Sequence, residues 1–125
     1  MPQERIRIII QDIVLDAELY DTKTGRAIAD ALPIESYPEE WGDEFYFDIP
    51  VEMPLDETAT TKVKVGDIGY WPPGNALAIF FGPTPISKGS EPVPASDVNL
   101  VGKIFGDPAV LRQAKGAKKI RIEKT

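Results

Sequence analysis

The sequence of 125 residues contains no cysteine and no histidine. The absence of cysteine excludes disulfide bonds, thiolate nucleophiles and cysteine-ligated zinc. The absence of histidine excludes imidazole acid–base catalysis, Ser-His-Asp and Cys-His nucleophiles, and histidine-bound metals. Any catalysis must therefore use Asp, Glu, Lys, Arg or Tyr side chains, or binding geometry alone. No catalytic constellation is evident, and we expect no cofactor and no metal site.

Long hydrophobic runs are also missing. No apolar segment approaches the roughly 18 residues needed to cross a bilayer, and the polar start of the chain carries no signal-peptide pattern. We therefore expect a cytoplasmic protein with no membrane partner. Asparagine and glutamine are scarce, whereas there are 12 prolines, a balance that favours a thermophilic source.

The formal net charge is −6, which argues against a nucleic-acid partner because such a partner requires a basic face. Basic residues do gather near the C-terminus: Arg112, Lys115, Lys118, Lys119, Arg121 and Lys124. They form either a solvated surface or a phosphate site, and the first is the more common origin of such a run. Acidic residues gather in the segment 35–57, but without the spacing of an EF-hand loop.

The length corresponds to one domain, residues 1–125. Alternation and apolar runs predict strands, and capping residues with helical spacing predict two short helices. The predicted strands cover residues 5–10, 13–19, 34–37, 43–50, 63–65, 68–71, 76–81, 98–105 and 119–123. The helices cover 22–32 and 107–114, and the polar segments 51–61 and 86–97 are expected as loops. The segment 13–19 fits a hairpin partner or an early helical turn, and its β-branched residues favour the strand.

Two features of the strands bear on the fold and on a binding site. The run 76–81 is continuously apolar, which indicates a strand buried on both faces. In the segment 43–50, Phe45, Phe47 and Ile49 fall on one face, and Glu44 and Tyr46 on the other. Many short strands with frequent turns favour a mainly β fold, and the two helices favour a closed, eight-stranded β-barrel whose ends they cover.

Several motifs carry a family resemblance over nearly the whole chain. They are Ala31-Leu32-Pro33, Trp41-Gly42-Asp43-Glu44-Phe45-Tyr46-Phe47, Gly66-Asp67-Ile68-Gly69-Tyr70-Trp71-Pro72-Pro73-Gly74, Ile79-Phe80-Phe81-Gly82-Pro83-Thr84-Pro85 and Val98-Asn99-Leu100-Val101-Gly102-Lys103-Ile104. In these motifs the chain resembles the cyclophilin-like fold, and more closely a small group of bacterial and archaeal cyclophilin-like proteins of uncharacterised function. The likeness to true peptidyl-prolyl isomerases is at the level of the fold.

The resemblance also implies losses from the isomerase pattern. The position of the catalytic arginine is occupied by Phe47, and that of the pocket histidine by Val98. The Gln-Phe-Phe motif is replaced by Ile79-Phe80-Phe81, which keeps the pocket phenylalanine as Phe81 and loses the glutamine. Prolyl isomerisation crosses a barrier of ~20 kcal/mol, and the arginine donates hydrogen bonds as amide conjugation breaks. Phenylalanine has no donor, so we expect isomerase activity to be weak or absent.

The resemblance places a candidate groove beside the stiff Pro72-Pro73-Gly74 turn. Tyr70, Trp71 and Phe81 are expected to line an apolar pocket with Phe47 and Val98 nearby, although aromatic residues on strands more often belong to a core. Glu44 is an acid or base if it lies in that groove, and otherwise a solvated residue of an outer face.

Asn99, an amide within a hydrophobic strand, either caps a backbone edge or contacts a ligand. The resulting hypothesis is a domain that binds a small molecule or a proline-containing peptide without conventional isomerase catalysis. Alternatives are a divergent isomerase, a regulatory protein-interaction module and, last, a carboxylate enzyme using Glu44. The oligomeric state does not follow from the sequence.

Overall fold

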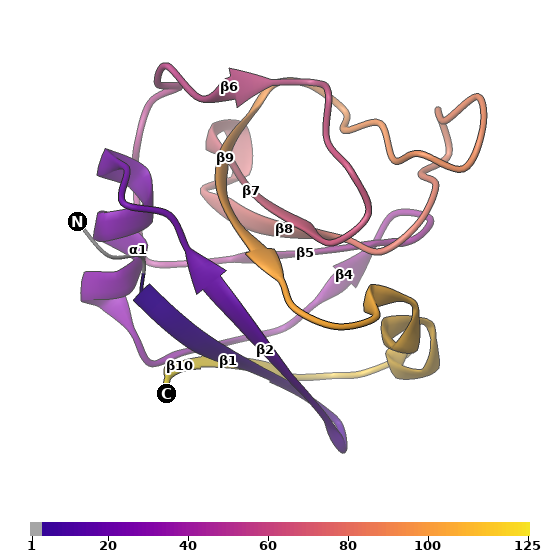
Figure 1. Cartoon of the computed structure of the whole chain (residues 1–125), viewed down its shortest axis with the longest axis horizontal. Coiled ribbons are helices and arrows are strands. Elements are labelled where there is room, and N and C mark those ends of the chain that lie inside the picture. The colour runs from indigo at the N-terminus through magenta and orange to yellow at the C-terminus, as the bar shows by residue number, and fades with distance from the viewer. Residues whose placement is uncertain (1–3) are drawn as a thin grey trace.

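A single curled sheet, seen in the computed structural model that describes residues 4–125, forms most of the molecule (Figure 1). Its strands are β1 (Glu4–Ile10), β2 (Ile13–Leu19), β3 (Ile34–Ser36), β4 (Glu39–Glu40), β5 (Glu44–Asp48), β6 (Ala59–Thr60), β7 (Asp67–Trp71), β8 (Ala76–Phe80), β9 (Val98–Ile104) and β10 (Ile120–Lys124). The order of hydrogen-bonded neighbours is β3-β10-β1-β2-β9-β7-β8-β5-β4, and β6 pairs with β9 beside this path. Every pairing is antiparallel.

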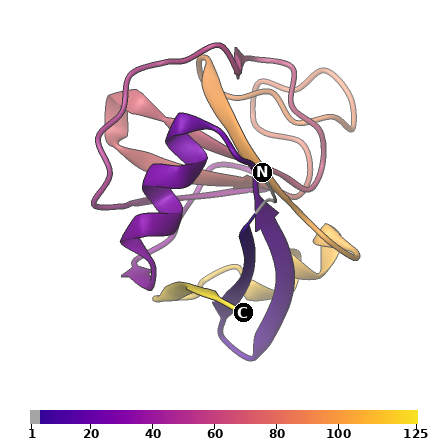
Figure 2. The ribbon, with the colours of Figure 1, turned by 60° about the vertical axis from the view of Figure 1, so that its left-hand side comes forward.

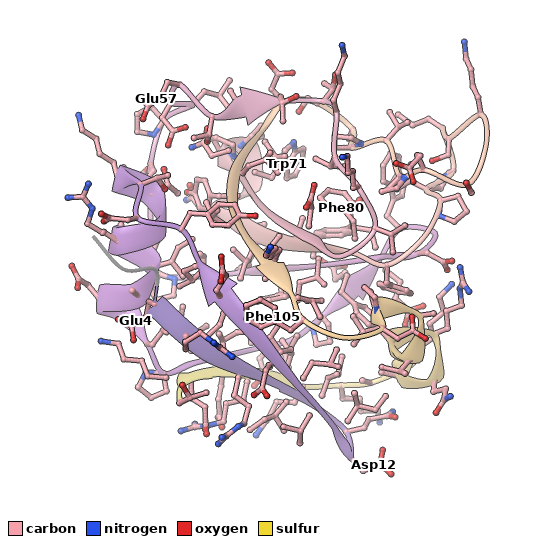
Figure 3. All side chains as sticks on the ribbon, viewed as in Figure 1. Glu4, Asp12, Glu57, Trp71, Phe80 and Phe105 are labelled. Atoms are coloured by element: carbon pink, nitrogen blue, oxygen red, sulfur yellow. The ribbon has the colours of Figure 1, made fainter. Side chains whose placement is uncertain are left out.

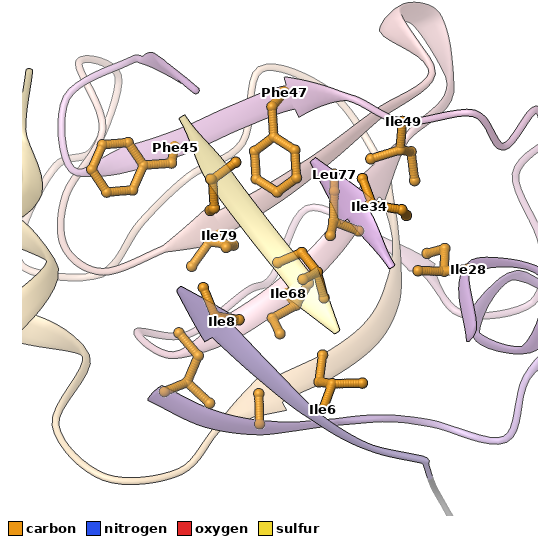
Figure 4. Packing of buried hydrophobic residues seen from close by; sticks show 14 of the residues in the cluster. Ile6, Ile8, Ile28, Ile34, Phe45, Phe47, Ile49, Ile68, Leu77 and Ile79 are labelled. Atoms are coloured by element: carbon orange, nitrogen blue, oxygen red, sulfur yellow. The ribbon is translucent and has the colours of Figure 1, made fainter. Parts of the chain in front are cut away.

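The inside of the curl holds the main hydrophobic core. Figure 4 shows Phe45 and Phe47 of β5 across from Ile8 of β1, with Ile28 of the helix closing one side. The alternation predicted for residues 43–50 is therefore confirmed: the two phenylalanines of β5 face the core, whereas Glu44 and Tyr46 lie on the opposite face. All five residues of β8 are buried, as its unbroken apolar run predicts.

An α-helix and a 3-10 helix lie at opposite ends of the curled sheet (Figures 1 and 2), and both contribute residues to the main core. A shorter 3-10 helix, η1 (Pro72–Gly74), joins β7 to β8. The helix α1 (Lys23–Ala31) begins at Thr22, whose side chain accepts a hydrogen bond from Gly25 N at 2.9 Å. It ends just before Pro33, which cannot continue a helix. The second helix, η2 (Pro108–Ala114), is a 3-10 helix capped by Asp107. Both predicted helices are confirmed, and 13–19 is the hairpin partner rather than a helical turn.

The predicted closed barrel of eight strands needs correction. The sheet has ten strands, and within residues 4–125 no pairing joins its end strands β3 and β4, so the sheet is a curled half-barrel. The additional strands β4 and β6 have two residues each, too short for a periodic pattern to indicate. The predicted strand at 63–65 is absent because reciprocal hydrogen bonds between Lys64 and Asp67 close a turn there.

Asn99 fastens the segment 51–61 to the body of the domain. Its side-chain amide donates to Pro54 O at 3.0 Å and to Thr24 Oγ1 at 3.1 Å, and its carbonyl accepts from Asp56 N at 2.9 Å. Tyr70 adds a second fastening, since its hydroxyl donates to Val51 O at 2.6 Å. The sequence left two roles open for Asn99, capping a backbone edge or contacting a ligand. The hydrogen bonds to Pro54 O and from Asp56 N correspond to the capping role.

Replacing Asn99 with alanine should therefore destabilise the fold. The substitution leaves buried partners without hydrogen bonds, and we expect a loss of about 3 kcal/mol in the free energy of unfolding. Urea unfolding measures this loss, and Gln113→Ala, which truncates an exposed amide, is the control, with an expected change within about 0.5 kcal/mol. Equal midpoints for the two variants would contradict the fastening role.

Candidate functional site

A cavity of about 230 Å³ opens on the face of the sheet opposite to the main core. It is lined by Trp41, Glu44, Tyr46, Trp71, Pro94, Ala95 and Val98, and we call it the Glu44 cavity. A small hydrophobic cluster, formed by Val63, Ala78, Phe80 and Val98, lies beside it. Figure 3 shows Trp71 and Phe80 in this part of the molecule. The lining is mostly apolar, and the carboxyl group of Glu44 and the phenol of Tyr46 are its only ionisable groups.

The strand β5 and the turn before it supply three of the lining residues. Trp41 N donates to Glu44 O at 3.0 Å, and this tight turn holds the two residues together. Tyr46 follows Glu44 by two positions and so shares its face. Across the ladder, Glu44 is paired with Phe80 and Tyr46 with Ala78 of β8, which places both side chains over the small hydrophobic cluster.

The segment 86–97 forms the opposite wall. Thr84 holds the start of this segment, since its hydroxyl bonds to Val93 O and its N–H donates to Ser87 Oγ at 2.9 Å. At the other end, Trp71 Nε1 donates to Ser96 Oγ at 2.7 Å. Pro94 and Ala95 lie between these two fastenings and face the cavity. The segment is thus a fixed part of the wall.

Gly69 permits the close approach of the strands that carry Trp71 and Val98. A Cβ atom on Gly69 would lie 2.8 Å from Val98 Cγ2, closer than side-chain atoms pack. Any larger residue at this position would push Val98 away from its place in the lining. The Ile68/Gly69 register shift between β7 and β9 occurs at the same point, which is where sheets accommodate local bends.

Glu44 contributes a buried carboxyl group to the mostly apolar lining of the cavity. It is 7% exposed, and its Oε1 is buried without a hydrogen-bond partner. Burial in apolar surroundings disfavours the ionised form and raises the pKa of Glu44 to about 7. Burial also raises the pKa of Tyr46, with the negative charges of Glu39 and Glu44 adding to the effect. The carboxyl group therefore exchanges a proton near neutral pH.

The structure brings together three of the seven predicted site residues: Glu44, Trp71 and Val98 all line the cavity. Of the two positions left open for Glu44, an apolar groove and a solvated outer face, this placement corresponds to the groove. Asn99 is instead engaged beneath the segment 51–61, as described above.

The other three predicted residues lie in the main core. Phe47 points to the inner face of β5 and is 1% exposed. Tyr70 is fully buried, with its hydroxyl bonded to backbone groups, and Phe81 packs on Phe45 with ring centroids 4.8 Å apart. The expectation that they line a groove is therefore replaced by a structural role. The physical reason is alternation: Tyr70 and Trp71 are neighbours on one strand and must point to opposite faces.

Sequence reasoning did not assign Trp41, Pro94 and Ala95 to the site. Trp41 lies outside the predicted strands and helices, and the polar segment 86–97 gave no periodic signal. Only the proximity of Trp41 to Glu44 in the sequence could have indicated its position.

The described residues hold no group of three or more acidic side chains that could bind a metal ion. No helix within residues 4–125 is long and apolar enough to cross a membrane. Several basic residues near the C-terminus are engaged in ion pairs: Arg112 and Lys115 contact Asp43 at 2.8 and 2.7 Å, and Arg121 contacts Glu35 at 3.1 Å. These pairs engage three of the six basic residues near the C-terminus with carboxylates of the chain itself.

A model of the cyclophilin-like family matches residues 4–123. The chain belongs to the cyclophilin-like family. It is similar to the hypothetical protein AF2241 from Archaeoglobus fulgidus, known from a solution structure, with 38% identity and a TM-score of 0.82 over 98% of this chain and 95% of that one. The resemblance to an uncharacterised cyclophilin-like group is thereby confirmed.

McbB, whose structure is a complex with tryptophan, shares the fold with a TM-score of 0.71 at 17% identity. The match covers 96% of this cyclophilin-like chain and 44% of McbB. No curated protein matches the chain.

The raised pKa of Glu44 predicts a particular dependence of stability on pH. Because the folded state keeps a proton that the unfolded chain releases, this group lowers stability as pH rises from about 4.5 to about 7. Glu44→Gln removes the effect, so the stability of the variant relative to wild type should increase over this range by about 3 kcal/mol. Chemical unfolding at a series of pH values measures it.

Glu39→Gln is the matched control, because Glu39 is an exposed carboxylate on the adjacent strand β4. Its stability relative to wild type should not rise in the same way. Parallel pH curves for wild type and Glu44→Gln would show that Glu44 ionises normally and would contradict the burial argument.

Proposed function

We propose that this cyclophilin-like domain binds a small, largely apolar molecule, or one apolar side chain of a peptide, in the Glu44 cavity, without prolyl isomerase catalysis. The observation that carries the proposal is the cavity itself: three aromatic side chains surround one buried carboxyl group whose Oε1 has no partner. A concave apolar site with few polar groups and a perturbed pKa is the usual form of a small-molecule site.

The size of the cavity limits the ligand. An engineered apolar cavity of about 150 Å³ accepts benzene, so about 230 Å³ accommodates a single or fused ring with a short substituent. This volume is smaller than the roughly 300–1,000 Å³ of pockets that bury a whole drug-sized ligand. A larger ligand or a peptide would therefore insert one group and leave the remainder outside.

The lining argues against isomerase chemistry. None of its seven residues is an arginine, a lysine or a glutamine, so the cavity lacks the cationic and amide donors with which isomerases stabilise a twisted prolyl amide. Phe47, which the resemblance aligns with the isomerase arginine, faces the main core, where a charged side chain would be buried without a partner. Restoring an arginine there would disrupt the fold rather than create a site.

A protease-coupled assay with an X-Ala-Pro-Phe peptide tests this part of the proposal. We expect the rate of cis–trans conversion with the protein to equal the uncatalysed rate. An authentic cyclophilin in the same assay confirms its sensitivity. Acceleration that grows with the concentration of this protein would contradict the proposal and favour a divergent isomerase.

Binding of small aromatic probes tests the cavity directly. Indole, phenol and tryptophan are suitable, the last because McbB was solved in complex with it, although McbB shares only the fold with this chain. We expect at least one probe to raise the melting temperature and to shift the indole N–H resonances of Trp41 and Trp71 in NMR spectra.

Trp71→Ala should weaken that binding at least tenfold, because it removes one aromatic wall. Tyr37→Ala, which truncates an aromatic residue that is 75% exposed and outside the cavity, is the control and should bind like wild type. Unchanged affinity in a folded Trp71→Ala variant, or the failure of every probe to bind the wild type, would overturn the proposed function.

A further inference from the structure

We propose that the Glu44 cavity selects an organic ammonium ion, that is, a protonated or alkylated amine attached to a compact apolar body, with its nitrogen placed at Glu44 Oε1. This inference rests on the proposed function and deepens it by naming the chemical class of the ligand. Three properties of the cavity support it: the nature of its walls, the unmet hydrogen bonding of its carboxyl group, and the sign of the surrounding charge.

The walls are suited to a cation. Trp41, Tyr46 and Trp71 all line the cavity, and the negative faces of aromatic rings attract ammonium groups, with tryptophan the strongest. Recognition of alkylated ammonium ions by groups of aromatic side chains is the best-known use of this attraction. An anionic ligand would find no positively charged partner among the lining residues, which are otherwise proline, alanine and valine.

The carboxyl group lacks the partner that an ammonium ion would supply. Glu44 Oε1 is the only buried side-chain oxygen or nitrogen within residues 4–125 that has no hydrogen-bond partner. A buried carboxylate is costly unless it is paired and hydrogen-bonded. An ammonium group provides both the opposite charge and N–H donors, and charge-assisted hydrogen bonds of this kind are about twice as strong as neutral ones.

The charged surroundings favour a cation as well. On its own strand, Glu44 is accompanied by the phenol of Tyr46, and Glu39 of β4 contributes a further negative charge near that phenol. The preceding residue, Asp43, is occupied by Arg112 and Lys115, so those cations are directed to it.

The remaining elements around the cavity present uncharged side chains. They are Trp71 from β7, Phe80 from β8, Pro94 and Ala95 from the segment 86–97, and Val98 from β9. The net charge of −6 adds a long-range attraction for cations.

A different ligand class would use the same carboxyl group in its protonated form, as a donor to a neutral carbonyl or hydroxyl group. The two classes differ in the sign of their pH dependence. An ammonium ion binds the ionised carboxylate, so its affinity should increase about tenfold per pH unit below the pKa of about 7 and level off above it. A neutral acceptor binds the protonated acid, so its affinity should fall above the same pH.

The test is a series of probes with one shape and three charges: 2-phenylethylamine, 2-phenylethanol and 3-phenylpropionate. Their affinities are measured by calorimetry or NMR titration with wild type, Glu44→Gln and the control Glu57→Gln, which changes an exposed carboxylate outside the cavity lining. The titrations are repeated at several pH values from about 5 to about 8, where the amine stays protonated. At about pH 8 we expect wild type and Glu57→Gln to bind the amine at least tenfold more tightly than the alcohol, and the carboxylate least. In Glu44→Gln the preference and the pH dependence of amine binding should disappear.

The possible outcomes separate this inference from the proposed function. If the alcohol binds as tightly as the amine, or if amine affinity falls with rising pH, the ammonium preference is wrong and the cavity remains an apolar site. If none of the three probes, nor any of the aromatic probes above, binds to wild type, the proposed function fails. Should Glu44→Gln fold poorly, the wild-type pH profiles of the amine and the alcohol still decide between the two classes.

Discussion

The alternation of side chains along β5 is the constraint on which both the core and the cavity depend. Successive residues of a strand point to opposite faces, so the sequence Glu44-Phe45-Tyr46-Phe47 sends two phenylalanines into the main core and leaves Glu44 and Tyr46 on the other face. A shift by one residue would exchange the two sets and bury a carboxylate in the core. Packing of the core therefore fixes the position of the cavity residues.

The cavity face gains stability from few contacts and contains one unfavourable group. The unfavourable group is the Glu44 carboxyl. The main core contains aromatic and branched residues from most strands and from α1, and their burial supplies the hydrophobic stabilisation that offsets the cost of this carboxyl group. Glu44 lacks a partner for Oε1, and that lowers the stability of the ligand-free fold. Groups that break the usual rules of stability concentrate at functional sites. The proposed ligand would supply the missing interaction and would stabilise the protein by mass action.

The elements that position the site were predictable from the sequence where they carry a periodic pattern, and the remainder was not. Alternation indicated the face of Glu44 and Tyr46, and the apolar run of β8 indicated its burial on both faces. The family resemblance placed Phe47 and Phe81 in the groove, whereas alternation put Phe47 on the same face as Phe45 and Ile49, and this face is the one that the core covers. The wall residues Pro94 and Ala95 lie in a segment positioned by side-chain hydrogen bonds to Thr84 and Trp71, contacts between distant residues that no local pattern encodes. The same holds for the pairing of the two-residue strands β4, at one end of the sheet, and β6, beside β9.

The most direct test of the account is the pKa of the Glu44 carboxyl group, followed by carbon-13 NMR in the free protein and in the protein saturated with 2-phenylethylamine. The account predicts a pKa of about 7 in the free protein and a value at least one unit lower in the complex, because an adjacent ammonium ion stabilises the carboxylate. A normal pKa in the free protein would show that Glu44 is not confined by the apolar cavity. A pKa that remains near 7 in the saturated complex would show that the amine does not bind beside this carboxyl group.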